Sequence, residues 1–179
     1  SPTRALLDAV LKYKTLRAET PEAKNHYLYD DQEPMLDFTL GGEAFPVELT
    51  PGDDRNAFRS IECQIMDWAD DTAYSLNDLA DGIHAGFITG TKLETWAEKN
   101  SLTGKDAEQV IFLIKAIREN RVEGRLNRAI GTFIRATSLR PTANFLSNQT
   151  QRHQWHLDIV PEVKAQAALN KRIAYELVF

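Results

Sequence analysis

The stretch Met66–Asp81, MDWADDTAYSLNDLAD, decides how the chain is expected to fold, because it lies near the middle of a long helical pattern. At about 100° per residue, four carboxylates and one phenol fall within an arc of roughly 80° on that helix. The members of this acidic stripe are Asp67, Asp70, Tyr74, Asp78 and Asp81. The sequence therefore predicts a helix with one strongly acidic face.

The opposite face of the same helix is apolar. Its members are Ile61, Ile65, Trp68, Thr72, Leu76, Leu79 and Ile83. An apolar face of this kind packs on other helices, so we expect the core to hold this helix and to direct the acidic stripe away from itself. Like charges at these spacings each destabilise a helix by about 0.2–0.5 kcal/mol, so either water screens them or a cation lies among them.

Two interpretations of the acidic stripe are open. A solvated acidic face is the usual meaning of a charge run, and it would leave the helix purely structural. A binding site is favoured by Tyr74, which lies inside the stripe, and by residues 60–91, which contain no Lys or Arg to pair with the acids. Carboxylate clusters become site candidates when they lie in a cleft.

Three segments resemble one known family. Ser60–Gly82, which includes ADDTAYSLNDLADG over Ala69–Gly82, resembles the ADDxAYxxxDxxD segment of the deoxynucleoside triphosphate triphosphohydrolases, the dGTPase-like members of the HD-domain metal phosphohydrolases. More weakly, Pro2–Tyr13 is similar to the helix that this family places shortly before its motif, and Pro161–Lys164 opens a segment like its closing helix.

The resemblance implies a mainly α fold, a helical HD-domain-like bundle. Residues 1–140 would be the distal, C-terminal part of the catalytic domain, and residues 141–179 an extended segment with a closing helix packed on it. It also implies a homo-oligomer, since that family forms tetramers or hexamers and often responds to dNTP effectors.

The resemblance further implies a site that hydrolyses a dNTP to a deoxynucleoside and triphosphate. One divalent metal ion, such as Mg²⁺ or Mn²⁺, would be held by a His, a His-Asp doublet and a distant Asp. Asp70 matches the distant Asp, Tyr74 matches the residue that packs against deoxyribose and phosphates, and Asp78 matches the acceptor of the sugar 3′-hydroxyl. Such an ion takes carboxylate and imidazole ligands and acidifies a bound water.

The chain departs from that family in its histidines, none of which is followed by Asp. They are His26, His84, His153 and His156. We therefore expect the C-terminal portion of a longer protein, inactive alone and without a tightly bound metal. Two further positions depart from the family: Asn77, where many relatives carry His, and Lys14, where relatives usually have Pro. Both departures concern the expected substrate preference and do not change the resemblance to the family. A rival hypothesis is a non-catalytic regulatory, oligomerisation or nucleotide-sensing domain.

Composition sets general bounds. The chain has 179 residues, 42% hydrophobic and 26% charged, which is ordinary for one soluble globular domain. A net charge of −5 argues against a polyanion-binding surface across the chain, and nothing indicates a nucleic-acid regulator. Cys63 is the single cysteine, so an intramolecular disulfide is excluded. Without a signal peptide or a membrane span, we expect a cytoplasmic protein.

The N-terminal third is expected to begin with a helix to about Leu16. Leu6, Leu7, Val10 and Leu11 would form its buried face. Lys12 and Tyr13 near its end are either partly buried surface residues or, by resemblance, substrate-binding residues in an active-site wall. Residues 18–57 are irregular, and 35–40 with 44–49 could pair as a small β-hairpin. Lys24 and Tyr29 are either surface-loop residues or contacts that close a nucleotide pocket.

The remaining segments read mainly as helix. The acidic helix is expected over about 57–88, a short helix over 91–100, and a long helical stretch from Asp106. Its apolar positions are Val110, Leu113, Ile114, Ile117, Val122, Leu126, Ile130 and Phe133. Its basic positions are Arg118, Arg121, Arg125 and Arg128. They form either a solvated face paired with Glu119 and Glu123, or a site from which Arg121 or Arg125 reaches a triphosphate, with Arg121 the favoured residue.

The tail combines an extended segment with a helix. Residues 149–159 alternate Trp155, Leu157 and Ile159, which indicates a short strand, and Pro161 starts a final helix. His153 and His156 bracket Trp155 but lack a nearby third ligand, so a metal site there is not expected.

Overall fold

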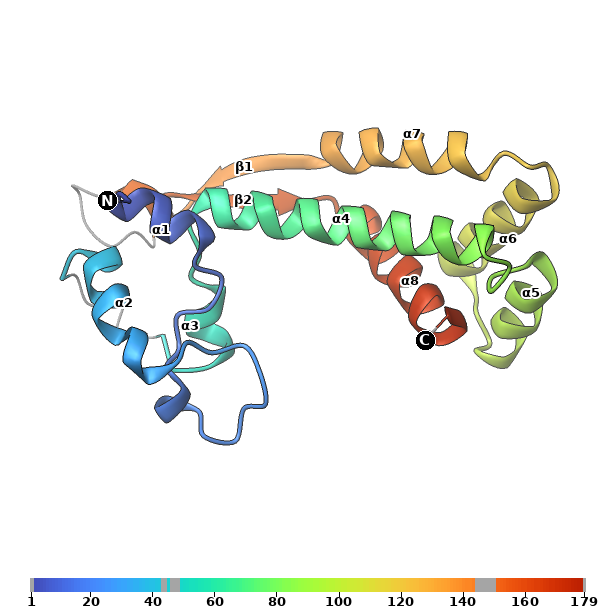
Figure 1. Cartoon of the computed structure of the whole chain (residues 1–179). Helices are drawn as coiled ribbons and strands as arrows, with labels where there is room; N and C mark the ends of the chain where they lie inside the picture. The colour runs from blue at the N-terminus through green and yellow to red at the C-terminus, as the bar shows by residue number, and fades with distance from the viewer. Residues whose placement is uncertain (1, 43–44, 46–48, 144–150, 179) are drawn as a thin grey trace. The chain divides into compact units, whose positions relative to one another are not determined.

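The computed structural model describes residues 2–42, 45, 49–143 and 151–178. Its helices and strands form two compact units, Ser1–Asp67 with Leu139–Asp158, here called unit 1, and Trp68–Ser138 with Ile159–Phe179, here called unit 2 (Figure 1). Each unit thus draws on both halves of the sequence.

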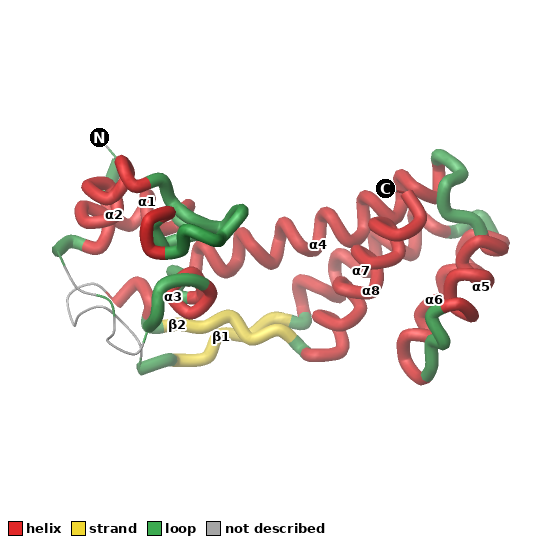
Figure 2. Tube along the Cα trace, turned by 90° about the horizontal axis from the view of Figure 1, so that it is seen from below, coloured by secondary structure: helices red, strands yellow, loops and turns green. Residues whose placement is uncertain are grey.

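The predicted mainly α fold is confirmed. Eight α-helices and one two-stranded sheet occur in the described part of the chain (Figure 2). The helices are α1 (Arg4–Val10), α2 (Glu33–Leu40), α3 (Asp53–Ala57), α4 (Ile61–His84), α5 (Gly90–Lys99), α6 (Gly104–Arg118), α7 (Val122–Arg135) and α8 (Pro161–Val178). The strands are β1 (Thr137–Pro141) and β2 (Trp155–Ile159). None of the described helices is long and apolar enough to cross a membrane.

The core of unit 2 is built from α4, α5, α6 and α8. Its buried members are Leu79, Ile88, Leu93, Trp96, Val110, Leu113, Ile114, Leu169 and Ile173. Gly82 lets the end of α4 approach its neighbours, since a Cβ there would lie 2.8 Å from the side chains of both Ile88 and Val178. The helical periodicity identified Leu79, Val110, Leu113 and Ile114 of this core. It was wrong for Ile130, which is 37% exposed rather than buried.

The extended segment predicted near the C-terminus is confirmed as β2. It pairs with β1, and backbone hydrogen bonds run from Thr142 N–H to Gln154 O (2.7 Å) and from Val160 N–H to Ala136 O (2.9 Å). Because the partner's number falls as the residue number rises, the two strands are antiparallel.

The prediction of a strand over 35–40 is wrong, because these residues belong to α2. Pro34 lies in its first turn, where a missing N–H costs nothing, and Gly41 ends the helix in the left-handed conformation with φ 76°. Leu36, Thr39 and Leu40 are the buried residues, at helical spacing. Of the second predicted strand, residues 44 and 46–48 lie outside the described residues.

The predicted N-terminal helix is shorter than expected and turned the other way. Helix α1 ends at Val10, and Leu6 and Val10 are 58% and 61% exposed, whereas Asp8 is fully buried. The prediction failed because a polar cluster, rather than apolar contacts, draws this helix into unit 1.

That polar cluster surrounds the Asp8 carboxylate. Lys14 Nζ lies 3.0 Å from Oδ1, while His153 Nε2 and Arg152 Nη1 lie 2.8 and 3.1 Å from Oδ2. Lys14 and Asp8 are inaccessible to solvent. Burial lowers the pKa of Lys14 even though Asp8 opposes it. Lys14 and Arg152 thus supply positive charge beside the buried Asp8 carboxylate.

His153 belongs to the same cluster as a neutral group. Burial lowers its pKa to about 4, against the opposing effect of Asp8. Its Nδ1 is buried with no hydrogen-bond partner among the described residues. Nε2–H therefore donates to Asp8, and protonation of Nδ1 would place a second proton where no described residue accepts it.

This burial predicts a pH-dependent stability. In the unfolded chain His153 binds a proton below its ordinary pKa of 6.5, whereas the folded chain does not bind it until about pH 4. Stability from this residue is therefore intact at pH 7, and about 2 kcal/mol is lost on going to pH 5. Urea denaturation of wild type and His153→Gln at both pH values measures it.

The matched control is His156→Gln, whose side chain is 51% exposed. We expect the difference in unfolding free energy between pH 7 and pH 5 to shrink in His153→Gln and to persist in His156→Gln. Equal pH dependence in wild type and His153→Gln would contradict the neutral buried state.

Candidate functional site

The apolar face of α4 fixes the orientation of this helix in unit 2. The Trp68 indole N–H donates to the Phe133 carbonyl oxygen at 3.3 Å, and the two rings stack with centroids 5.7 Å apart. Leu76 and Leu79 are 2% and 1% exposed. With this face buried, the residues on the other side of the helix are held outward.

The outward residues of α4 in unit 2 include the three predicted site residues. Asp70 and Tyr74 are exposed, Tyr74 to 55%, and Asp78 is half-buried. Asp71, which lies off the stripe, forms an ion pair with Lys171 of α8. Within the described residues, Asp70, Asp78 and Asp81 have no ion-pair partner. These carboxylates are thus left free for a ligand.

Asp67 differs from the other acids because it is already paired in unit 1. Lys12 Nζ forms an ion pair with Oδ1, and Arg59 Nη1 lies 2.6 Å from Oδ2. The hydrogen bond that the Lys12 ammonium donates to Asp67 raises the pKa of Lys12. Burial alone would raise the pKa of Asp67, but Lys12 and Arg59 outweigh it and lower the pKa. The sequence missed these partners because both lie outside residues 60–91.

The other N-terminal candidates occupy aromatic and loop positions of unit 1. Tyr13 stacks on His26 with ring centroids 4.8 Å apart. Tyr29, 63% exposed, meets the edge of Tyr27 at 5.8 Å, and Lys24 is exposed. A substrate-binding role for Lys12, Tyr13, Lys24 or Tyr29 stays a prediction.

The donor set for a metal ion is incomplete in the described part of the chain. There, no three His, Cys, Asp or Glu residues gather closely enough to hold a metal. Asp70 offers one carboxylate, and His153 is engaged with Asp8. The described residues therefore do not fit a complete metal centre, which needs several converging ligands.

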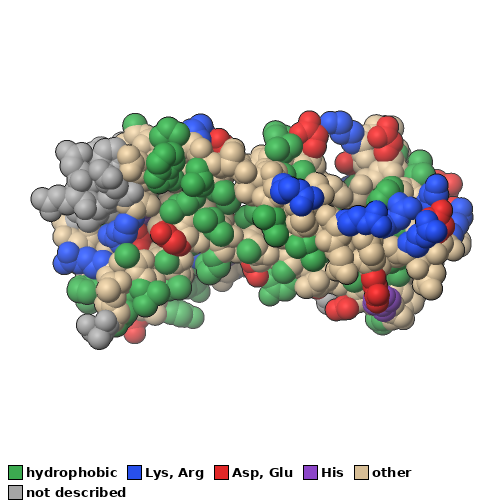
Figure 3. All heavy atoms as spheres, turned by 90° about the horizontal axis from the view of Figure 1, so that it is seen from above, with side chains coloured by type: hydrophobic (Ala, Val, Ile, Leu, Met, Phe, Trp, Pro, Cys, Tyr) green, Lys and Arg blue, Asp and Glu red, His purple; other side chains and the backbone are tan. Residues whose placement is uncertain are grey.

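The predicted basic run lies on the end of α6 and on α7 (Figure 3). Arg121 is exposed and its Nη1 lies 3.7 Å from Glu119. Arg125 is more enclosed, with Nη2 3.3 Å from Glu119 and its guanidinium 4.2 Å from the Phe112 ring centroid. Glu123, a predicted partner of this run, instead faces His84 at 3.5 Å. A role for Arg121 in phosphate binding stays a prediction.

Several curated proteins are similar to this chain in sequence. A deoxyguanosinetriphosphate triphosphohydrolase-like protein of Streptomyces coelicolor is 28% identical over 98% of the chain and 46% of its own length. Proteins of the same description from Corynebacterium glutamicum and Shewanella loihica are 35% and 31% identical over 59% and 66% of the chain, and 23% and 30% of their own lengths. The chain thus spans less than half the length of these relatives. No protein-family model matches it.

The two faces of α4 predict opposite responses to truncation. Tyr74→Ala should change the unfolding free energy by less than about 0.5 kcal/mol, because the side chain is exposed. Leu76→Ala, two residues away, should cost about 2–5 kcal/mol, because the side chain is buried. Urea denaturation of both variants measures the difference. A large loss in Tyr74→Ala would show that this ring is a packing residue.

Proposed function

Because this chain is a relative of the deoxyguanosinetriphosphate triphosphohydrolase-like proteins, we propose that it forms the distal half of a dNTP triphosphohydrolase site in the complete protein. The reaction would release a deoxynucleoside and inorganic triphosphate. The observation that carries this proposal is the ADDxAYxxxDxxD register on the open side of α4, opposite a face buried in the core. We further propose a cytoplasmic homo-oligomer.

Each open residue of α4 has a proposed role. Tyr74 would lay its ring against the deoxyribose, since an exposed aromatic side chain has apolar area to offer a sugar face. Asp78 would accept a hydrogen bond from the 3′-hydroxyl, and Arg121 would contact phosphate. Asp70 would give one carboxylate to a divalent ion, Mg²⁺ or Mn²⁺, whose remaining ligands lie outside the described residues. Such an ion supplies an acidified water and a polarised phosphoryl oxygen.

A second candidate function is nucleotide sensing without hydrolysis. It is favoured by the incomplete donor set, since a carboxylate on its own does not hold a metal ion firmly. In that case Tyr74 and Asp78 would bind a deoxynucleotide, and Asp70 would have no catalytic part. The two functions differ in whether triphosphate is released.

Triphosphate release tests the proposal on the product of the complete reading frame that encodes this chain. A mixture of dNTPs with Mn²⁺ or Mg²⁺ should yield triphosphate, and Asp70→Asn should abolish it. Asp78→Asn should lower kcat/KM by roughly 10- to 150-fold, because a hydrogen bond to a charged group contributes about 1.5–3 kcal/mol.

The matched control is Glu62→Gln, the same carboxylate-to-amide change at an exposed position of α4 outside the acidic stripe. We expect near wild-type activity. Deoxynucleotide binding that Asp78→Asn weakens, without triphosphate release under any metal, would support sensing instead. Neither binding nor release would leave α4 with a purely structural role.

A further inference from the structure

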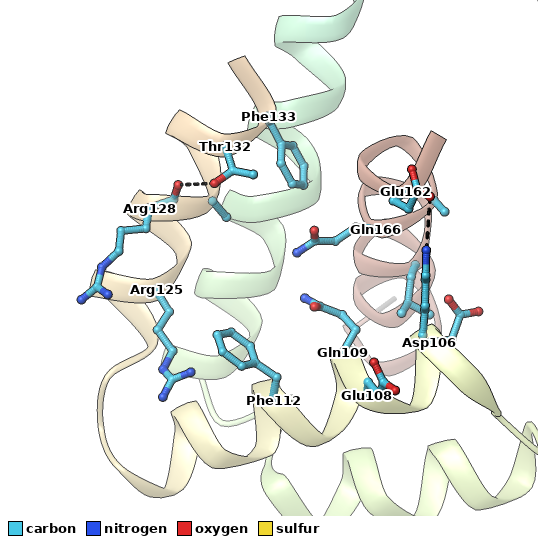
Figure 4. Close-up of a pocket in the computed structure, with 14 residues that line it drawn as sticks. Asp106, Glu108, Gln109, Phe112, Arg125, Arg128, Thr132, Phe133, Glu162 and Gln166 are labelled. Atoms are coloured by element: carbon cyan, nitrogen blue, oxygen red, sulfur yellow. Dashed lines mark hydrogen bonds and ion pairs between the residues drawn. The ribbon is translucent and has the colours of Figure 1, made fainter. Parts of the chain in front are cut away.

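A groove runs between α6, α7 and α8 on unit 2 (Figure 4). Its volume is about 520 Å³, within the range that takes a small molecule. Phe112, Phe133 and Leu169 supply apolar lining, while Gln109 of α6 and Gln166 of α8 extend their amides toward its middle. The groove therefore combines apolar walls with a few converging polar groups, as ligand sites do.

Beside the groove lies a buried amide that has no hydrogen-bond partner among the described residues. Asn170 is 1% exposed, and neither its Nδ2 nor its Oδ1 has a hydrogen-bond partner among the described residues. It lines a recess of about 20 Å³ that shares Gln109 and Gln166 with the groove. A buried amide that stays unpaired destabilises a fold, so its retention points to a group that enters the recess and pairs with it.

Charge is divided between the two sides of the groove. Arg125 and Arg128 lie on the α7 side, and Asp106, Glu108 and Glu162 on the α6 and α8 side (Figure 4). Lys105 Nζ lies 3.2 Å from Glu162 and leaves the other two acids unpaired within the described residues. A ligand that follows this division is anionic at one end and carries hydrogen-bond donors at the other.

We propose that this groove binds a nucleoside monophosphate whose base carries an exocyclic amino group. The phosphate meets Arg125, the base edge meets the amides of Gln109 and Gln166, and the amino group faces the acidic side. Arg125 already contacts Glu119 at 3.3 Å, so the cationic side matches one phosphate rather than a triphosphate.

This groove is separate from the open face of α4. Leu76 and Leu79, from the buried face of that helix, line the recess next to Asn170. Tyr74 and Asp78 point to the opposite side of α4 and do not line the groove. Its ligand is therefore independent of the dNTP chemistry proposed above.

Calorimetric titration of the chain with adenosine and guanosine monophosphates tests the proposal. We expect saturable binding at or below about 1 mM, with adenosine and inorganic phosphate each at least about tenfold weaker. Arg125→Gln should weaken monophosphate binding about tenfold or more and leave adenosine binding unchanged. Arg118→Gln is the matched control, because its guanidinium pairs with Glu94 at 2.6 Å and does not line the groove.

Asp78→Asn separates the two nucleotide sites and should leave monophosphate binding within about twofold. Three outcomes would overturn the proposal. The first is that the monophosphates show no saturable binding, and the second is that inorganic phosphate alone binds equally well. The third is that Asp78→Asn abolishes monophosphate binding while Arg125→Gln retains it.

Asn170→Leu gives a second, independent readout. Without ligand it should raise the midpoint of thermal unfolding by about 2–4 °C, because an unpaired buried amide is replaced by an apolar group of similar size. The same variant should weaken monophosphate binding. A lowered midpoint with unchanged binding would show that the amide serves the fold alone and would overturn its part in the site.

Discussion

The burial of one side of α4 is the constraint on which the rest of unit 2 depends. Trp68 donates to and stacks on Phe133 of α7, Leu76 is buried, and Leu79 enters the core shared with α5, α6 and α8. A helix held along one side has one orientation about its axis. Any rotation would expose these side chains and leave the indole N–H of Trp68 without its hydrogen-bond partner. The same contacts that stabilise the unit therefore determine which residues of α4 meet solvent.

Helical periodicity predicted this division for Trp68, Leu76 and Leu79, because residues that share a face recur every three or four positions whatever surrounds them. It was wrong for Ile65, which was expected on the buried face and is 50% exposed. The contacts of Asp67 and Asp8 were not predictable in this way. Lys12 and Arg59 reach Asp67 from other segments, and His153 meets Asp8 across 145 residues of sequence. The periodicity of one segment does not indicate which charged residue from a distant segment will contact it.

The error over 35–40 has a different origin. Leu36–Leu40 alternates apolar and polar residues for too few positions to distinguish a strand from a helix, and Pro34 suits either the first turn of a helix or the edge of a sheet. Tertiary burial of Leu36, Thr39 and Leu40 decides in favour of the helix. For the candidate site, the register on α4 was visible in the sequence, whereas the Asn170 recess was not, since its walls come from four helices.

The discontinuity of unit 1 has a consequence for synthesis on the ribosome. His153 emerges 145 residues after Asp8, when residues 68–138 of unit 2 have been made but α8 has not. Until then Arg152 and His153 cannot contact the Asp8 carboxylate. The burial of Asp8 is then less favourable, so α1 stays exposed to water. Closing so long a loop is slow, because its entropy is lost before any contact rewards it. Asp8 and Lys14 are therefore translated long before the residues that complete their cluster, and the surroundings of α1 are among the last parts of this chain to fold.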